Sequence, residues 1–260
     1  MDNNSGIKTF FEYLPESVKF YKLKKEGLAK LIFVLVLFCQ LAGNYIQYTT
    51  LNLISSEDID RIYSVVLAGM VPYEGDINLP SEKTVNLVLI IFGTALLVKL
   101  LSNLFLSVYM YSYLSGRKGK DAGFKASFKG TFKHLGRLIF YNIIFGIMFF
   151  IGCMFFVIPG ILVYVIFVFG YCYILDLKLR VSEAMTASSE ITKGRKAQIA
   201  SALIGFFILF EMPIFLLFSG SSLQIACLAS FFSTISSMIL QRLIVQLYMD
   251  LEYKKGVDTK

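Results

Sequence analysis

The sequence has little of what enzymes use for catalysis. It contains a single histidine, His134, and four cysteines, none of them in a CxxC pair. One histidine cannot build an HExxH zinc site, and the spacing offers no Ser–His dyad. A GxxxxGK[ST] phosphate loop is also missing, which argues against ATP hydrolysis. We therefore expect a non-enzymatic protein without catalytic residues, metal site or cofactor. His134 is expected to be an interfacial polar residue.

The cysteines lie inside apolar runs. They are Cys39, Cys153, Cys172 and Cys227. Such positions favour plain apolar packing over a zinc site or a disulfide framework.

Charge is also scarce, at only 17% of the 260 residues, whereas 56% are hydrophobic. The mean hydropathy is +0.67. Soluble domains are about 45–50% apolar. The composition therefore excludes a soluble enzyme, a disordered chain and a collagen-like fibre, and it indicates a multi-pass membrane protein. The net charge of +7 then reflects loop topology rather than nucleic-acid binding.

Six apolar runs are long enough to span a membrane. A helix rises about 1.5 Å per residue, so about 20 residues cross about 30 Å of hydrocarbon. One run has about twice that length, and we predict that Pro159-Gly160 forms a hairpin turn within it. Because the runs are continuous rather than alternating, we expect an all-α fold in one domain, 1–260. The predicted spans are 31–53, 86–114, 138–157, 159–175, 197–218 and 223–249.

Basic residues gather on one side of this topology. Of the 25 Lys and Arg residues, all but Arg61, Lys83, Lys99 and Arg242 fall in the N-terminal segment, in the loops after the second and fourth spans, or in the C-terminal tail. The positive-inside bias therefore predicts that both termini are cytoplasmic. No cleavable signal is visible, so the first span is expected to stay as a membrane anchor.

The loop after the second span contains an amphipathic segment. Phenylalanines recur every fourth residue, with a lysine after each: Phe124, Lys125, Phe128, Lys129, Phe132 and Lys133. Such a helix suits the membrane surface, with rings in the acyl boundary and ammonium groups near anionic headgroups. The alternative is a helix packed on the bundle with solvated lysines. A further helix is expected on the other side of the membrane, where Ile59, Ile62, Val66 and Met70 share one face.

Similar short polar helices are expected before the first and fifth spans. Ser127 and Thr131 align with Ser188 and Thr192 at an offset of 61 residues. The chain is thus predicted to consist of three copies of a unit with one surface helix and two spans, although chance similarity between amphipathic segments is the alternative.

Three ionisable residues fall inside the spans: Lys99, Glu211 and Arg242. A charge at the bilayer centre costs about 2.5 kcal/mol or more when unpaired, so each should face a partner or water. Lys99 and Glu211 lie at similar depth, and we predict a polar pair that either lines a path or is purely structural. Arg242 lies close enough to the end of its span to snorkel.

One stretch resembles a known family. Ile158-Pro159-Gly160-Ile161, Glu183-Ala184, Ser188 and Thr192-Lys193-Gly194 follow its pattern. They are similar to the YciC-like bacterial integral membrane family and to the membrane domain attached to some glycerophosphodiester phosphodiesterases. The resemblance covers about 40 residues, and Ser189-Glu190-Ile191 depart from it where the family often has an aromatic residue. It implies a protein of the bacterial cytoplasmic membrane and carries no phosphodiesterase reaction.

These features favour an accessory or scaffold protein of the envelope that binds membrane lipids, a membrane-protein partner or a second copy of itself. The alternative is a transporter of a small solute or lipid that uses Lys99 and Glu211.

Overall fold

The computed structural model describes residues 8–23, 25–70, 79–120, 123–155, 157–218 and 222–253, without the side chains of 66–70, 155 and 157. Helices joined by short turns make up these segments, and no strand occurs in them. Lys24, Asp121 and the tail lysines, which contribute to the charge pattern above, lie outside this part of the chain.

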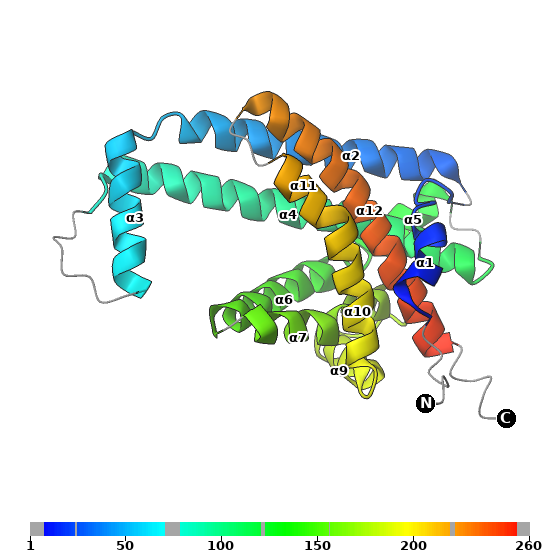
Figure 1. The fold of residues 1–260 in the computed structure, drawn as a ribbon. Coiled ribbons are helices and arrows are strands. Elements are labelled where there is room, and N and C mark those ends of the chain that lie inside the picture. Colours follow the sequence, from blue (N-terminus) through cyan, green and yellow to red (C-terminus); the bar gives the residue numbers. More distant parts are fainter. Residues whose placement is uncertain are drawn as a thin grey trace.

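The first half of the chain is built on two long helices that lie side by side, α2 (Glu26–Leu51) and α4 (Glu82–Arg117). The short helix α1 (Phe10–Ser17) precedes them, and α3 (Ser56–Met70) crosses their far end (Figure 1). At 36 residues α4 is about 54 Å long, so it exceeds the hydrocarbon thickness. It also extends beyond both predicted bounds.

The second half adds a hairpin and two further spans. A short helix, α5 (Phe124–Phe132), leads into α6 (Leu135–Phe155), which packs against α7 (Val157–Phe167). The helix α8 (Gly170–Asp176) completes the fourth span and is followed by α9 (Val181–Thr192). The fifth span consists of α10 (Lys196–Phe206), a π-helical turn η1 (Phe207–Glu211) and α11 (Met212–Leu217), and α12 (Leu223–Tyr253) forms the last.

The prediction of six membrane-spanning helices in an all-α fold is confirmed, because six helices are long and apolar enough to cross a membrane. A short helix precedes each pair of spans, as the repeat predicts. Ser127 and Thr131 of α5 and Ser188 and Thr192 of α9 are all buried. That the three units are copies of one ancestor stays a prediction.

Part of the sequence pattern on which the resemblance rests forms a packing face. Ala184, Ser188 and Thr192 repeat every fourth residue on α9 and are fully buried. Ser188 Oγ donates to the carbonyl of Ile166 on α7 at 2.7 Å, and Gly194 leaves the helix at a φ of 75°. The motif therefore holds α9 against the spans.

The core lies in the halves of the spans near α1 and the end of α12. Tyr109, Tyr141, Phe169 and Tyr248 are among its fully buried side chains. The far half of α4 contributes little, and Leu96 and Leu97 are each 57% exposed. In Figure 1 the α6–α7 hairpin diverges from α2 and α4 in this direction. These apolar exposed faces suit contact with lipid.

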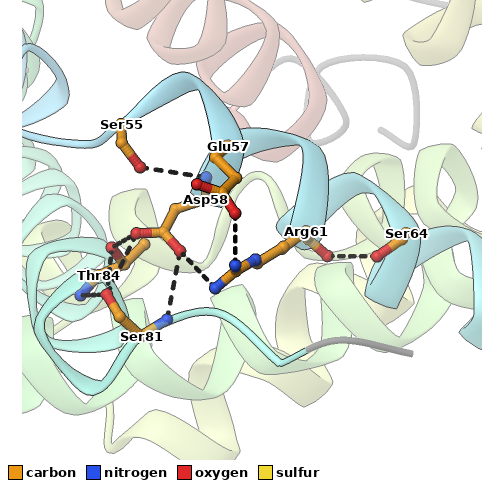
Figure 2. Close-up of polar contacts among 7 residues, drawn as sticks. All are labelled: Ser55, Glu57, Asp58, Arg61, Ser64, Ser81 and Thr84. Carbon is orange, nitrogen blue, oxygen red and sulfur yellow. Dashed lines mark hydrogen bonds and ion pairs between the residues drawn. The ribbon is translucent and has the colours of Figure 1, made fainter. Parts of the chain in front are cut away.

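Asp58 connects α3 to the start of α4 (Figure 2). Its carboxylate accepts hydrogen bonds from Thr84 Oγ1 at 2.6 Å and Ser81 Oγ at 3.1 Å, and it lies 3.6 Å from the Arg61 guanidinium. The hydrogen bond from Thr84, followed by those from Ser81, lowers the pKa of Asp58. This cluster fixes the first turn of α3, whose predicted helix is confirmed.

Two sequence predictions need correction here. Pro159 and Gly160 lie inside the first turn of α7 rather than in the hairpin turn, because α6 ends at Phe155 and α7 begins at Val157. Proline fits the first helical turn, where its missing N–H has no acceptor to lose. Among the cysteines, all free, only Cys172 is buried, whereas Cys153 and Cys227 are exposed on the bundle surface.

The hairpin depends on close approach of α6 and α7 at glycine. A Cβ on Gly160 would meet Cys153 Sγ and would lie 3.2 Å from the Cys153 backbone nitrogen. We expect Gly160→Ala to destabilise the protein by about 1–3 kcal/mol through overpacking, measured by unfolding in detergent. Gly146→Ala on α6 is the control, since a Cβ on Gly146 would have no neighbour within 4 Å. Equal stability of the two variants would contradict this packing.

Candidate functional site

An open cavity of about 530 Å³ with both polar and apolar walls lies among α2, α4, η1, α11 and α12 in the halves of the spans remote from α1. Most of its hydrogen-bonding groups come from α2 and α12, while α4 and α11 add apolar walls. The lining residues are Gln40, Gly43, Asn44, Gln47, Val98, Glu211, Ile214, Phe215, Phe218, Ala229, Ser230 and Ser233. Polar groups within a membrane are costly, so their concentration here makes this cavity the candidate functional site.

Helix α2 supplies one wall of the cavity. Gln40, Asn44 and Gln47 are spaced by four and three residues, which puts all three on one face. Asn44 Nδ2 donates to Ser230 Oγ at 2.6 Å, and Thr234 Oγ1 donates to Gln40 Oε1 at 3.2 Å. These bonds join α2 to α12 and orient the amides.

Gly43, on the same helix, allows α4 to approach. A Cβ there would lie 2.5 Å from Val98 Cγ2. The missing side chain thus sets the spacing of α2 and α4 beside the cavity.

Glu211 is the one ionisable residue among the lining residues. It ends the π-helical turn η1, two residues before Pro213. Proline leaves a carbonyl one turn earlier without its N–H partner, and a π turn is a common way to accommodate this, often at functional sites. Glu211 Oε1 accepts a hydrogen bond from Ser236 Oγ at 2.6 Å. The carboxylate makes no ion pair with any residue that the structure describes.

The predicted Lys99–Glu211 pair is wrong. Lys99 is exposed on the outer face of α4, and it has no ion-pair partner within the described segments. Its neighbour Val98 faces the cavity instead. Successive helical residues are separated by about 100° around the axis. Lys99 and Glu211 therefore lie at similar depth in the membrane but do not face each other.

A second cluster of polar groups lies where α1 crosses α4 and α12. Arg242 is 2% exposed, so it does not snorkel as predicted. Its guanidinium donates to the carbonyls of Lys19 at 2.5 Å and Lys22 at 2.9 Å, and it pairs with Glu16. It also lies 4.4 Å from the ring centroid of Tyr113. Arg242 thus satisfies the carbonyls that follow the end of α1.

Further hydrogen bonds hold α1 in place. Tyr13 on α1 donates to Asp250 Oδ2 at 2.9 Å, and Tyr109 on α4 donates to the carbonyl of Phe20 at 2.8 Å. Burial acts to raise the pKa of Glu16, but its hydrogen bond to Arg242 and the charges of Arg242 and Lys19 outweigh this and lower it. The sequence pattern had not singled out Tyr13 or Asp250.

Asp176, which no sequence pattern singled out, forms a third cluster. It ends α8, pairs with Lys118, and accepts from Tyr248 at 3.0 Å and Tyr253 at 2.5 Å. These contacts tie the fourth span to α4 and α12.

The amphipathic helix α5 exposes its lysines and two of its three phenylalanines, whereas Phe128 is partly buried and packs against the core. Phe124 and Phe132 are about half exposed, and Lys125, Lys129 and Lys133 are exposed. The rings contact one another along the helix. The Phe124 and Phe128 rings are tilted with centroids 4.9 Å apart, and the Phe128 and Phe132 rings stack with centroids 6.0 Å apart. The buried face consists of Ser127 and Thr131.

His134, just after α5, is 7% exposed rather than an exposed interfacial group. Burial, together with Arg137, Lys133 and Lys178, lowers its pKa.

Comparisons of this chain with protein-family models, with curated proteins and with solved structures each found no match. Membership of the YciC-like family therefore stays a prediction from the residues quoted above.

We expect Arg242→Met to release α1. The variant loses two charge-assisted hydrogen bonds to backbone carbonyls, each worth about 1.5–3 kcal/mol. Hydrogen–deuterium exchange of residues 10–17 should accelerate by tenfold or more, since tenfold corresponds to about 1.4 kcal/mol. Lys19→Met is the control, because its 3.6 Å ion pair with Glu16 is exposed and worth about 0–1 kcal/mol. Equal exchange in both variants would contradict the role of Arg242.

Proposed function

We propose that this multi-pass membrane protein binds a small monovalent cation in the cavity beside Glu211 and carries it across the membrane. The observation that carries the proposal is a carboxylate within the membrane that faces a polar cavity and has no cationic partner among the described residues. A cation would supply the missing charge, and the hydroxyl and amide groups of α2 and α12 would replace its water.

We place the protein in the bacterial cytoplasmic membrane with both termini in the cytoplasm. Support comes from the basic residues, which gather around α1, α5 and α9 at one end of the spans. The cavity at Glu211 would then lie in the outer half of the membrane. Its carboxylate is about 10 Å along the helix from the end of α11.

Thiol reagents of opposite charge test whether the cavity holds water and attracts cations. Ser233→Cys places a thiol on its lining. We expect the cationic 2-aminoethyl methanethiosulfonate to react there about tenfold faster than the anionic 2-sulfonatoethyl reagent, after correction for intrinsic rates, because a carboxylate several ångströms away attracts cations. Glu211→Gln should remove this preference while keeping the hydrogen bond from Ser236. Peptide mass spectrometry separates the new thiol from the native cysteines.

Leu97→Cys is the matched control, since Leu97 lies next to Val98 on the lipid-exposed face of α4. It should react slowly with both reagents. If the thiol introduced by Ser233→Cys is as unreactive as this control, the proposal is overturned.

Transport is measured as uptake of sodium, rubidium and choline ions into proteoliposomes under an inside-negative potential. Uptake of at least one ion should fall by tenfold or more in Glu211→Gln. It should be unchanged in Lys99→Gln, since Lys99 is exposed away from the cavity. Uptake unaffected by Glu211→Gln would rule out Glu211 as the binding group.

A second candidate function, lipid binding by an accessory protein of the envelope, draws support from the exposed lysines of α5 and from its exposed rings, Phe124 and Phe132. Each lysine near an anionic surface contributes about 1 kcal/mol. Replacing Lys125, Lys129 and Lys133 by Gln should therefore reduce retention of phosphatidylglycerol by a hundredfold or so, seen by native mass spectrometry. Replacing Lys83, Lys99 and Lys178 is the control with equal charge loss. Equal retention in both triple variants would exclude α5 as the lipid-binding surface.

A further inference from the structure

A separate cavity lies at the crossing of α1, α4 and α12. Its volume is about 180 Å³, and it is lined by Lys8, Glu12, Tyr13, Glu16, Arg117, Gln246 and Asp250. It is remote from the Glu211 cavity, because Arg117 ends α4 whereas Val98 lies near its middle. Groups of both charge signs therefore surround one small space at the boundary of the membrane.

The cationic residues of this cavity, Arg117 and Lys8, are placed to bind an anion. Arg117 and Lys8 are both exposed, and neither forms an ion pair with a residue in the described segments. A guanidinium offers two parallel donors that match a phosphate or a carboxylate.

The anionic side is built from Asp250, Glu12 and Glu16. Asp250 is 5% exposed, and the Tyr13 hydroxyl donates to its Oδ2 at 2.9 Å, which fixes the carboxylate. Glu12 is exposed and accepts a hydrogen bond from Thr9 Oγ1 at 2.8 Å. Gln246 lies one helical turn before Asp250 on α12 and is 4% exposed. These oxygens suit a primary ammonium group, which donates three hydrogen bonds.

We propose that this cavity binds a zwitterion that carries a primary ammonium close to an anionic group, of the phosphoethanolamine type. Arg117 and Lys8 hold the anion, and Asp250 with Glu12 holds the ammonium. Because Arg117 lies at the end of a span and α1 lies across the span ends, the cavity is at the depth of lipid headgroups. The bound zwitterion connects α1 to α4 and α12. The site is independent of the proposed function at Glu211.

Binding to the diacyl lipid is tested by native mass spectrometry of the full chain with phosphatidylethanolamine and phosphatidylcholine. The two lipids share the phosphate, but the quaternary ammonium of choline has no N–H donor. We expect at least tenfold stronger retention of phosphatidylethanolamine. Arg117→Gln should reduce this retention tenfold, and it leaves the fold intact because Arg117 is exposed. Glu12→Gln and Asp250→Asn should remove the preference over phosphatidylcholine.

Two matched controls change charge elsewhere at the same end of the spans. Lys193→Gln just after α9 and Glu190→Gln on α9 replace exposed residues outside the cavity, and both should retain phosphatidylethanolamine as the wild type does. Hydrogen–deuterium exchange supplies a second readout, since bound phosphatidylethanolamine should slow exchange in residues 10–17 of the wild type and not of Arg117→Gln.

Soluble glycerophosphoethanolamine and glycerophosphocholine distinguish a lipid headgroup from a soluble metabolite as the bound zwitterion. If the soluble ethanolamine compound slows exchange in α1 and the diacyl lipid does not, the zwitterion is a soluble metabolite. If both act, the site takes the lipid headgroup. Equal retention of the ethanolamine and choline lipids, or stronger retention of phosphatidylglycerol, would overturn the proposal. Glu211→Gln should leave this binding unchanged, which separates its failure from that of the proposed function.

Discussion

Hydrogen bonds between α2 and α12 are the interaction on which the polar interior depends. Lipid offers no partner to a polar side chain, so each such group must find one within the protein. Asn44 on α2 donates a hydrogen bond to Ser230, and Gln40 on α2 accepts one from Thr234. Glu211 at the end of η1 accepts one from Ser236 on α12. These bonds explain how a chain that is 56% hydrophobic keeps amides, hydroxyls and a carboxylate in its spans. They also leave the charge of Glu211 without a cation among the described residues, and on this ground we propose a binding site there.

The two ends of the molecule have different character. Near α1, aromatic side chains and buried ionic contacts pack the spans tightly, with Arg242 holding the chain after α1 and Asp176 holding the fourth span. In the remote halves, α4 is largely exposed and the α6–α7 hairpin diverges from it (Figure 1). One end of the molecule is thus tightly packed, and the other has few buried contacts around a cavity. Because the elements that move are those with few buried contacts, this arrangement suits a proposed binding site that has to open.

Much of the fold could be predicted from the sequence, because continuous apolar runs determine helices in lipid. The six spans, α3 and the exposed lysines of α5 followed from local pattern alone. The site followed less well. Glu211 could be predicted because a lone carboxylate stands out in an apolar span. Lys99 was predicted as its partner from similar depth in the membrane alone. The rotation of α4 about its axis instead turns Val98 toward the cavity. The helical spacing of Gln40, Asn44 and Gln47 indicates a shared polar face, although these residues are not among the predicted site residues. Arg242 and Asp176 could not be assigned, since their partners are set by how distant helices cross.

Reaction of Glu211 with carbodiimides tests most directly whether its carboxylate faces a water-accessible cavity. In reconstituted membranes, a water-soluble carbodiimide with glycine ethyl ester should convert Glu211 to the amide, seen as a mass shift of its peptide. Modification by lipid-soluble dicyclohexylcarbodiimide alone would show that the carboxylate faces lipid, and it would contradict the polar cavity as the functional centre of this protein.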